Sequence, residues 1–320
     1  MAYRGFVKNG VVVFSGEARP AEGTEVEIIR ISAPLDGGLP KTFRCDDAHA
    51  FLREVKNLGQ RGWIFRGHAR AVEWRLEPSL HRFLVEHGIK KSSWYVREKE
   101  TLRRFRAVAH LYLSHLPHRQ DQLSWLSLVR HHGGPTRLLD FTFNPAVAMY
   151  FAVREARPEK GAFCVHALHL ASIRNGSREK RASLPIYRDR QPPSNPQVKE
   201  YCIGEGKGQA DFVGLFDPPL ASERLAAQDG LFVVPSRIDL DLESWLRDLD
   251  VRPPPRPHNA RWLKYEFRYD SLDHYTAIVK QLAQMGMSAA RLFPGLTGLC
   301  ESMGFAWHEP AKDLSPDEDE

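Results

Sequence analysis

Polar side chains that a protein core does not need lie on both sides of a pair of glycines and precede an apolar helix. The segment HHGGPTRLLDFTFNPAVAMYFA covers residues 131–152. Its Gly-Gly-Pro triplet excludes regular structure, a short apolar run follows it, and Asn144 with Pro145 is a typical helix start. A strand that ends beside a helix N-terminus commonly holds anions and hydroxyls. The polar residues of this segment are therefore the first candidates for a functional site: His131, His132, Thr136, Arg137, Asp140 and Thr142.

The composition is that of an ordinary globular protein. The chain has 320 residues, of which 42% are hydrophobic and 27% charged, and no apolar run approaches the roughly 18 residues of a membrane span. The N-terminus lacks the pattern of a signal peptide. The four cysteines are isolated, which favours reduced thiols and argues against structural zinc. We expect a cytoplasmic protein with no membrane partner and no metal.

The net charge is +5 and the isoelectric point is near 9.0. This excess permits binding to nucleic acid or another polyanion, but many enzymes are equally basic. The basic face expected on a helix from Trp94 to about Leu116 is consistent with either a solvated surface or nucleic-acid contact.

The turn residues, the linker composition and the acidic C-terminal segment predict that the chain has three parts. Residues 1–34 form a small β module, in which FVKNGVVVF is a hairpin with an Asn-Gly turn. A linker rich in Pro and Gly leads to the main domain, residues 41–308. The acidic residues 309–320 are expected to be disordered. The β module is equally consistent with a dimer contact, so the oligomeric state stays open.

Strands and helices interleave in the main domain without a regular βαβ repeat. A helix from Ala48 to Leu58 is followed by a strand from Trp63 to His68, and later strands are expected at 162–170, 231–234 and 262–269, the last at a sheet edge. Residues 172–219 are expected to be a long loop. This pattern favours the α+β class over a doubly wound sheet.

Four stretches resemble, in order, the signature segments of the FRG-domain family, named for the Phe-Arg-Gly at residues 65–67. They are WIFRGHARAVEWRLEPSLHR, HHGGPTRLLDFTFNPAVAMYFA, RLAAQDGLFVVP and LAQMGMSAARLFPGLTGLCESM. The resemblance covers about residues 48–305. One departure is His68, where the family more often has Gln.

The order of three elements also resembles ADP-ribosyltransferases of the Arg-Ser-Glu type. In these enzymes an Arg ends the first core strand, a Ser or Thr motif runs into an apolar helix, and a Glu or Gln motif precedes a third strand. Arg66, Thr142 and Gln228 stand in that order here. The resemblance implies a split β core, NAD as the substrate, and transfer of ADP-ribose to a nucleic acid or protein by a toxin or antiviral defence effector.

The same resemblance implies roles for individual residues. Arg66, Thr142, Gln228 and Asp229 would be catalytic, and His131 and His132 are possible acid–base groups. The residues implied in NAD binding are Arg66, Gly67, His68, Arg137, Asp140, Phe141, Phe143 and Tyr150. Within this set Gly67 would admit a ligand to the backbone, Arg137 would bind phosphate with Asp140 holding it, and the aromatic residues would stack.

The catalytic carboxylate is the departure from that pattern. Gly230 stands where a Glu is expected, so Asp229, Glu205 or Glu266 substitutes, or the site binds a nucleotide without reaction. Three other interpretations remain open on the same residues. They are a structural ion-pair network around Arg66, Arg137 and Asp140, a non-catalytic module for nucleic acid or protein, and a nuclease-like toxin using His131, His132 and Asp140.

Overall fold

In a computed structural model the chain is described over residues 5–8, 11–14, 40–58, 62–156, 161–173, 211–218, 222–248 and 261–306. It divides into two compact units, Met1–Leu35 and Asp36–Glu320. In the first unit β1 (Gly5–Lys8) and β2 (Val11–Phe14) pair antiparallel, as the predicted hairpin requires. The predicted acidic tail at 309–320 lies outside the described residues.

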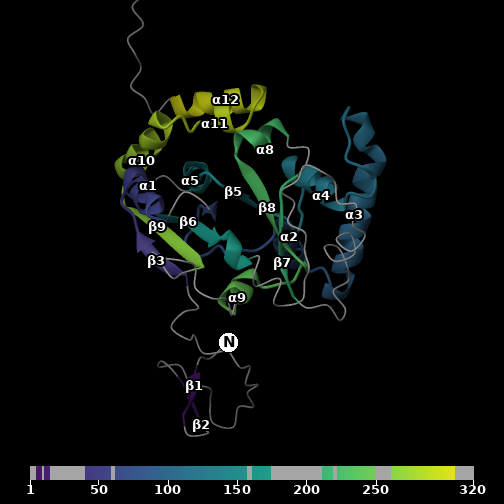
Figure 1. Ribbon diagram of the computed structural model, residues 1–320, viewed down its shortest axis with the longest axis horizontal. Helices are drawn as coiled ribbons and strands as arrows, with labels where there is room; N and C mark the ends of the chain where they lie inside the picture. The colour runs from purple at the N-terminus through teal and green to yellow at the C-terminus, as the bar shows by residue number, and fades with distance from the viewer. Residues whose placement is uncertain are drawn as a thin grey trace, which may run out of the picture. The chain divides into compact units, whose positions relative to one another are not determined.

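A seven-stranded mixed sheet is the framework of the second unit (Figure 1). Its strands run in the order β3-β9-β6-β4-β5-β8-β7, and all neighbours are antiparallel except β3 and β9. The strands are β3 (Lys41–Arg44), β4 (Trp63–His68), β5 (Leu139–Thr142), β6 (Gly161–His169), β7 (Val213–Phe216), β8 (Gly230–Pro235) and β9 (Trp262–Tyr269). This sheet and its surrounding helices confirm the predicted α+β class.

The central strand β4 is well paired with one neighbour and weakly paired with the other. β4 and β6 share six register pairs, from Trp63↔His169 to His68↔Cys164. β4 and β5 share a single register pair, Phe65↔Thr142. The two strands therefore separate beyond Phe65, and residues 66–68 face the start of β5 without a backbone ladder. We call this place the central split.

Three groups of helices bury the sheet in separate apolar clusters. α1 (Ala48–Lys56), α5 (Pro145–Arg154) and α10 (Leu272–Gln284) pack on the face that carries Phe65 and Phe163. α3 (Trp94–Val108) and α4 (Gln122–His131) cover Phe216 and Phe232. α9 (Leu242–Arg247) lies on a cluster with Ile64 and Leu168. The remaining α-helices are α2 (Ser79–Glu86), α8 (Glu223–Ala227), α11 (Ala289–Leu292) and α12 (Leu296–Ala306).

Helix α5 begins as predicted and packs very closely on β4. The Asn144 side chain accepts a hydrogen bond from the Ala146 amide, and Pro145 occupies the first turn. A Cβ atom added to Gly67 would lie 2.0 Å from the Ala148 carbonyl oxygen and 2.7 Å from the Ala152 nitrogen. Gly67 therefore makes room for the helix. The predicted role of Gly67, admitting a ligand to the backbone, is wrong because α5 occupies that space.

Three sequence predictions need correction. β9 is not an edge strand, because it lies between β3 and β6. The expected loop at 172–219 contains β7, a strand too short to show periodicity. The helix that starts at Trp94 ends at Val108, and beyond it Tyr112 is 81% exposed.

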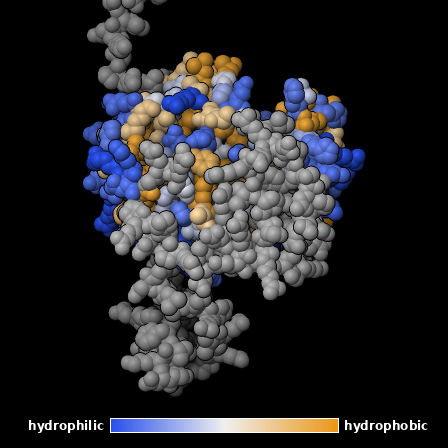
Figure 2. All heavy atoms as spheres, viewed as in Figure 1, coloured by the Kyte–Doolittle hydropathy of each residue, from blue (hydrophilic) through white to orange (hydrophobic). Residues whose placement is uncertain are grey.

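The outward side of α12 carries exposed apolar residues at helical spacing, Leu296, Leu299 and Met303. Figure 2 shows an orange region at the top, where Figure 1 shows α11 and α12. Among the described helices, none is both long enough and apolar enough for a transmembrane segment.

Candidate anion-binding site at the central split

Arg66 bridges the two strands of the central split. Its Nη1 donates a hydrogen bond of 2.7 Å to the backbone carbonyl of Asp140 on β5. Its Nε donates to Nε2 of His68, two residues along β4, at 3.2 Å. No partner of Nη2 is present among the described residues, so this edge of the guanidinium keeps its donors for another group. The side chain is 15% exposed.

Asp140 binds a second arginine more tightly than the first. Nε and Nη2 of Arg130, from the last turn of α4, lie 2.7 and 2.6 Å from Oδ2 of Asp140, whereas Nη1 of Arg66 is 3.7 Å away. Partial desolvation raises the pKa of the Asp140 carboxyl, but Arg130 and Arg66 outweigh it and hold this pKa below its ordinary value. Asp140 is therefore a carboxylate that orders two guanidinium groups.

Further charged groups make this place positive. Arg82 on α2 and Arg130 act electrostatically on Arg66, and burial together with these two charges lowers the pKa of Arg66 to about 10. The charges of Asp140 and Arg130 also act electrostatically on Arg224 of α8. Glu155, at the end of α5, acts on Arg66 and Arg130. We call these four arginines, together with the carboxylates of Asp140 and Glu155, the arginine cluster. Its net charge is +2.

His131 and His132 lie at the edge of the arginine cluster. The His131 carbonyl accepts from Nη1 of Arg224 at 3.1 Å, and its Nδ1 is 3.1 Å from the Ser222 hydroxyl. Burial, aided by His132 and Arg224, lowers the pKa of His131 to about 4. His131 is therefore neutral at pH 7, and its contacts join α4 to the start of α8.

The predicted hydroxyl and amide are used to build the turn before β8. The Thr142 hydroxyl donates to the Gln228 carbonyl at 2.6 Å and accepts from the Asn144 amide at 2.9 Å. The Gln228 side-chain amide donates to the Leu292 carbonyl at 2.9 Å. Arg66, Thr142 and Gln228 thus come from three adjacent strands or strand ends, and the side chains of Thr142 and Gln228 make hydrogen bonds that hold this turn.

Asp229 has the geometry of a turn residue and an exposed side. Its φ of 48° is in the left-handed region, and its carbonyl accepts from the Phe143 amide at 2.9 Å. Burial raises the pKa of its carboxyl. At the next position a Cβ on Gly230 would meet Leu225 Cδ1 at 2.5 Å, so Leu225 covers the place of the expected Glu. Of the other two carboxylates considered, Glu266 is buried and paired with Arg268, and Glu205 lies outside the described residues.

The aromatic candidates separate into core and surface residues. Phe141 is 3% exposed and Tyr150 is 4% exposed, and both belong to apolar clusters. Phe143, between β5 and α5, is 41% exposed. Among these three predicted stacking residues, only Phe143 presents a ring to the surface.

Arg137 is not placed to bind an external phosphate. It is 1% exposed and forms an ion pair with Glu98 of α3. Its Nη1 donates to the Ser236 carbonyl at 2.9 Å. The prediction that Asp140 holds Arg137 is wrong, because the carboxylate of Asp140 is directed to Arg130 and Arg66.

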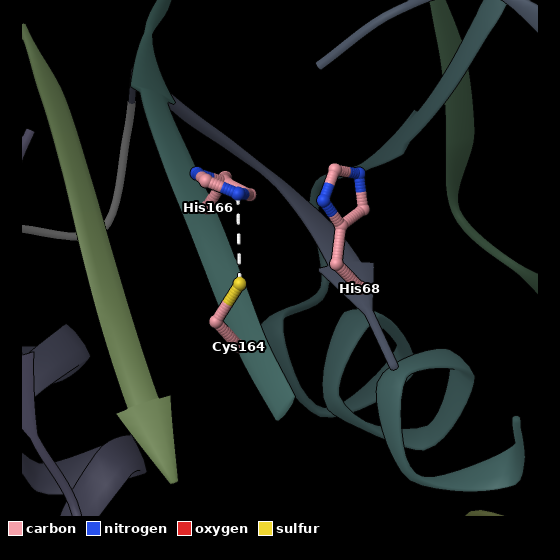
Figure 3. A group of neighbouring side chains, drawn as sticks. All are labelled: His68, Cys164 and His166. Carbon is pink, nitrogen blue, oxygen red and sulfur yellow. Dashed lines mark hydrogen bonds between the residues drawn. The ribbon is translucent and has the colours of Figure 1, made fainter. Parts of the chain in front are cut away.

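His68, Cys164 and His166 form a buried cluster whose ligand atoms lie within 4.8 Å of one another (Figure 3). The hydrogen bonds of the two histidine rings argue against a metal ion at this cluster. The Trp262 indole donates to Nδ1 of His166 at 3.0 Å, so in the neutral ring Nε2 carries the hydrogen and faces the Cys164 sulfur at 3.5 Å. Nε2 of His68 likewise accepts a hydrogen bond, from Nε of Arg66. Metal-bound histidines instead donate their outer N–H to an acceptor.

Arg82, Arg130 and Arg224 are not among the site residues predicted from the sequence. A signal for Arg130 was available, since it immediately precedes His131 at the end of a predicted helix, where a cation is favoured. Arg82 and Arg224 sit on other helices, and nothing in their local sequence places them near Asp140.

Comparison with known families agrees with one part of the resemblance. Residues 61–161 match the model of the FRG domain, a shorter range than the one inferred from the four stretches. No curated protein and no solved structure matches the chain. The matched range includes β4, α2, α4 and β5, which carry Arg66, Arg82, Arg130 and Asp140. Residues 61–161 of this chain are therefore an FRG domain, and they supply most of the arginine cluster.

Proposed function

We propose that the protein binds NAD at the arginine cluster and transfers its ADP-ribose group to a macromolecule. The observation that carries the proposal is the fixed orientation of Arg66 across the central split, within a cluster of net charge +2. A pyrophosphate carries two negative charges, and guanidinium groups bind its oxygens through paired N–H donors. The free Nη2 edge of Arg66 is suited to this contact.

The reaction needs further groups near the ribose. The bond between ribose C1′ and nicotinamide breaks, and its electron pair leaves with nicotinamide through a state that resembles an oxocarbenium ion. A nucleophilic atom of the acceptor then bonds to C1′ and loses its proton to a base. Asp229 is the carboxylate we assign to this role. The exposed ring of Phe143, whose amide bonds the Asp229 carbonyl, is assigned to the nicotinamide.

Titration of the purified chain with NAD, followed by measurement of released nicotinamide, tests the proposal. Arg66→Met removes the charge while keeping side-chain length, and we expect it to weaken NAD binding at least tenfold. Arg104→Met is the matched control, because Arg104 is exposed on α3 and pairs with Glu100. We expect the control to bind within about twofold of wild type. Equal binding by Arg66→Met and wild type would overturn the proposal.

A second function is favoured by Gly230. Because Leu225 covers the place where a catalytic Glu is expected, the arginine cluster can be a site that binds a nucleotide or nucleic-acid phosphate without turnover. In that case NAD or inorganic pyrophosphate binds with no nicotinamide release. Binding of nucleic acid that weakens steeply with salt would favour the polyanion version.

A further inference from the structure

The buried face of Arg66 is held by one side chain. His68 is 2% exposed, so it does not reach a ligand, although it was predicted to contact NAD. Its Nε2 accepts the Nε–H of Arg66 at 3.2 Å. We infer that His68 is a positioning residue that orients the guanidinium of Arg66 for anion binding, an inference that rests on the proposed function of the site.

Two hydrogen bonds determine the plane of the Arg66 guanidinium. One runs from Nε to His68 on β4, and the other from Nη1 to the Asp140 carbonyl on β5. A planar group that is fixed at two of its three nitrogens presents the third in one direction. With the His68 bond removed, the side chain keeps only its contacts with Asp140 and turns about them. The cost of ordering a long side chain must then be met by the ligand.

The surroundings of His68 keep it an acceptor. The ring is buried between Arg66 of its own strand and His166 of β6, whose ring centroid is 4.9 Å away, and the ring of Trp74 is 6.0 Å away. Burial above all, with the neighbouring His166, Arg66 and Arg82, lowers the pKa of His68 well below 6.5 and so favours the neutral ring. Because Nε2 accepts from Arg66, the single proton of that neutral ring is on Nδ1. Nδ1 makes no hydrogen bond among the described residues, and the backbone of Trp74 offsets part of the lowering of the pKa of His68.

Glutamine and asparagine provide a matched pair of substitutions. The side-chain oxygen of Gln reaches about the position of the histidine Nε2, whereas that of Asn is one methylene shorter. We expect His68→Gln to bind NAD within about threefold of wild type. We expect His68→Asn to bind about tenfold more weakly, which is the usual effect of losing a hydrogen bond to a charged group. His68→Leu, which fills the space without an acceptor, should match His68→Asn.

A double-mutant cycle separates positioning from a general effect on folding. In the Arg66→Met background the substitution His68→Asn should change NAD binding by less than twofold, because the group it positions is gone. A loss of tenfold in both backgrounds would overturn the inference, as would wild-type binding by His68→Asn. If Arg66→Met alone has no effect, the proposed function fails and the inference fails with it. If Arg66→Met binds poorly and His68→Asn binds normally, the inference alone fails.

Discussion

Arg137 and Glu98 form an ion pair in the protein interior, with the guanidinium 1% and the carboxylate 3% exposed. The pair joins α3 to the segment that leads into β5. Removing one partner leaves a buried charge, so Glu98→Gln should lower the free energy of unfolding by about 3–5 kcal/mol. Urea unfolding measures this loss.

The same pair predicts what Arg137 does not do. Replacing both partners, as in Arg137→Met with Glu98→Leu, removes two buried charges and should restore most of the lost stability. If Arg137 has only this structural role, the double variant binds NAD as wild type does. Loss of NAD binding in a stable double variant would show that Arg137 contacts the ligand after all.

Asp140 should make stability depend on pH in the acidic range. Its pKa is lowered in the folded protein relative to the ordinary value of 3.8. The stabilisation is therefore complete above that value and is lost as the pH falls through the lower, folded pKa. The difference in unfolding free energy between wild type and Asp140→Asn should shrink below about pH 4. A difference that stays constant from pH 7 to pH 3 would contradict the ion pairs described here.

Gly67 and Gly230 should respond differently to alanine. In Gly67→Ala the new methyl group meets the backbone of α5 at 2.0 Å, so we expect a loss of about 3 kcal/mol or more. In Gly230→Ala it meets the end of the Leu225 side chain, which can turn away, so the loss should be about 1 kcal/mol or less. Thermal unfolding of the two variants makes the comparison. A loss of about 1 kcal/mol or less in Gly67→Ala as well would mean that α5 shifts away from β4 at little cost in stability.

His166 should stay neutral well into the acidic range. Burial, with Lys264 and Arg66, lowers its pKa from 6.5 to about 3. Since the unfolded chain binds this proton more readily, stability should fall as the pH decreases from about 6.5 towards 3. The imidazole resonances of His166, assigned with His166→Asn, should not shift between pH 8 and pH 5. A midpoint near 6.5 would contradict the buried, Trp262-bonded ring.

Local chemistry was sufficient to predict most of the elements. The Asn144-Pro145 start of α5, the strand at Trp63–His68 and the Asn-Gly hairpin each depend on residues within one turn or strand. The place of β9 in the sheet could not be predicted, because an interior strand needs a partner on each side. Those partners, β3 and β6, lie far away in the sequence.

The candidate site shows the same division. Arg66 and Asp140 stand out locally, one at a strand end beside a glycine and the other before a helix start. Arg137 stands out equally, yet it belongs to the core because Glu98, 39 residues earlier, reaches it. Whether a polar side chain serves packing or binding depended here on a distant partner, and a single sequence does not reveal which partner is in reach.

The contact between Gly67 and α5 changes what the Phe-Arg-Gly triplet stands for. Phe65 is a core residue, and Gly67 leaves room for the close approach of α5. Two of the three residues of the triplet are therefore explained by packing. A chain recognised by this triplet alone is therefore identified largely by how its central strand packs, and only Arg66 bears on the proposed binding of an anion.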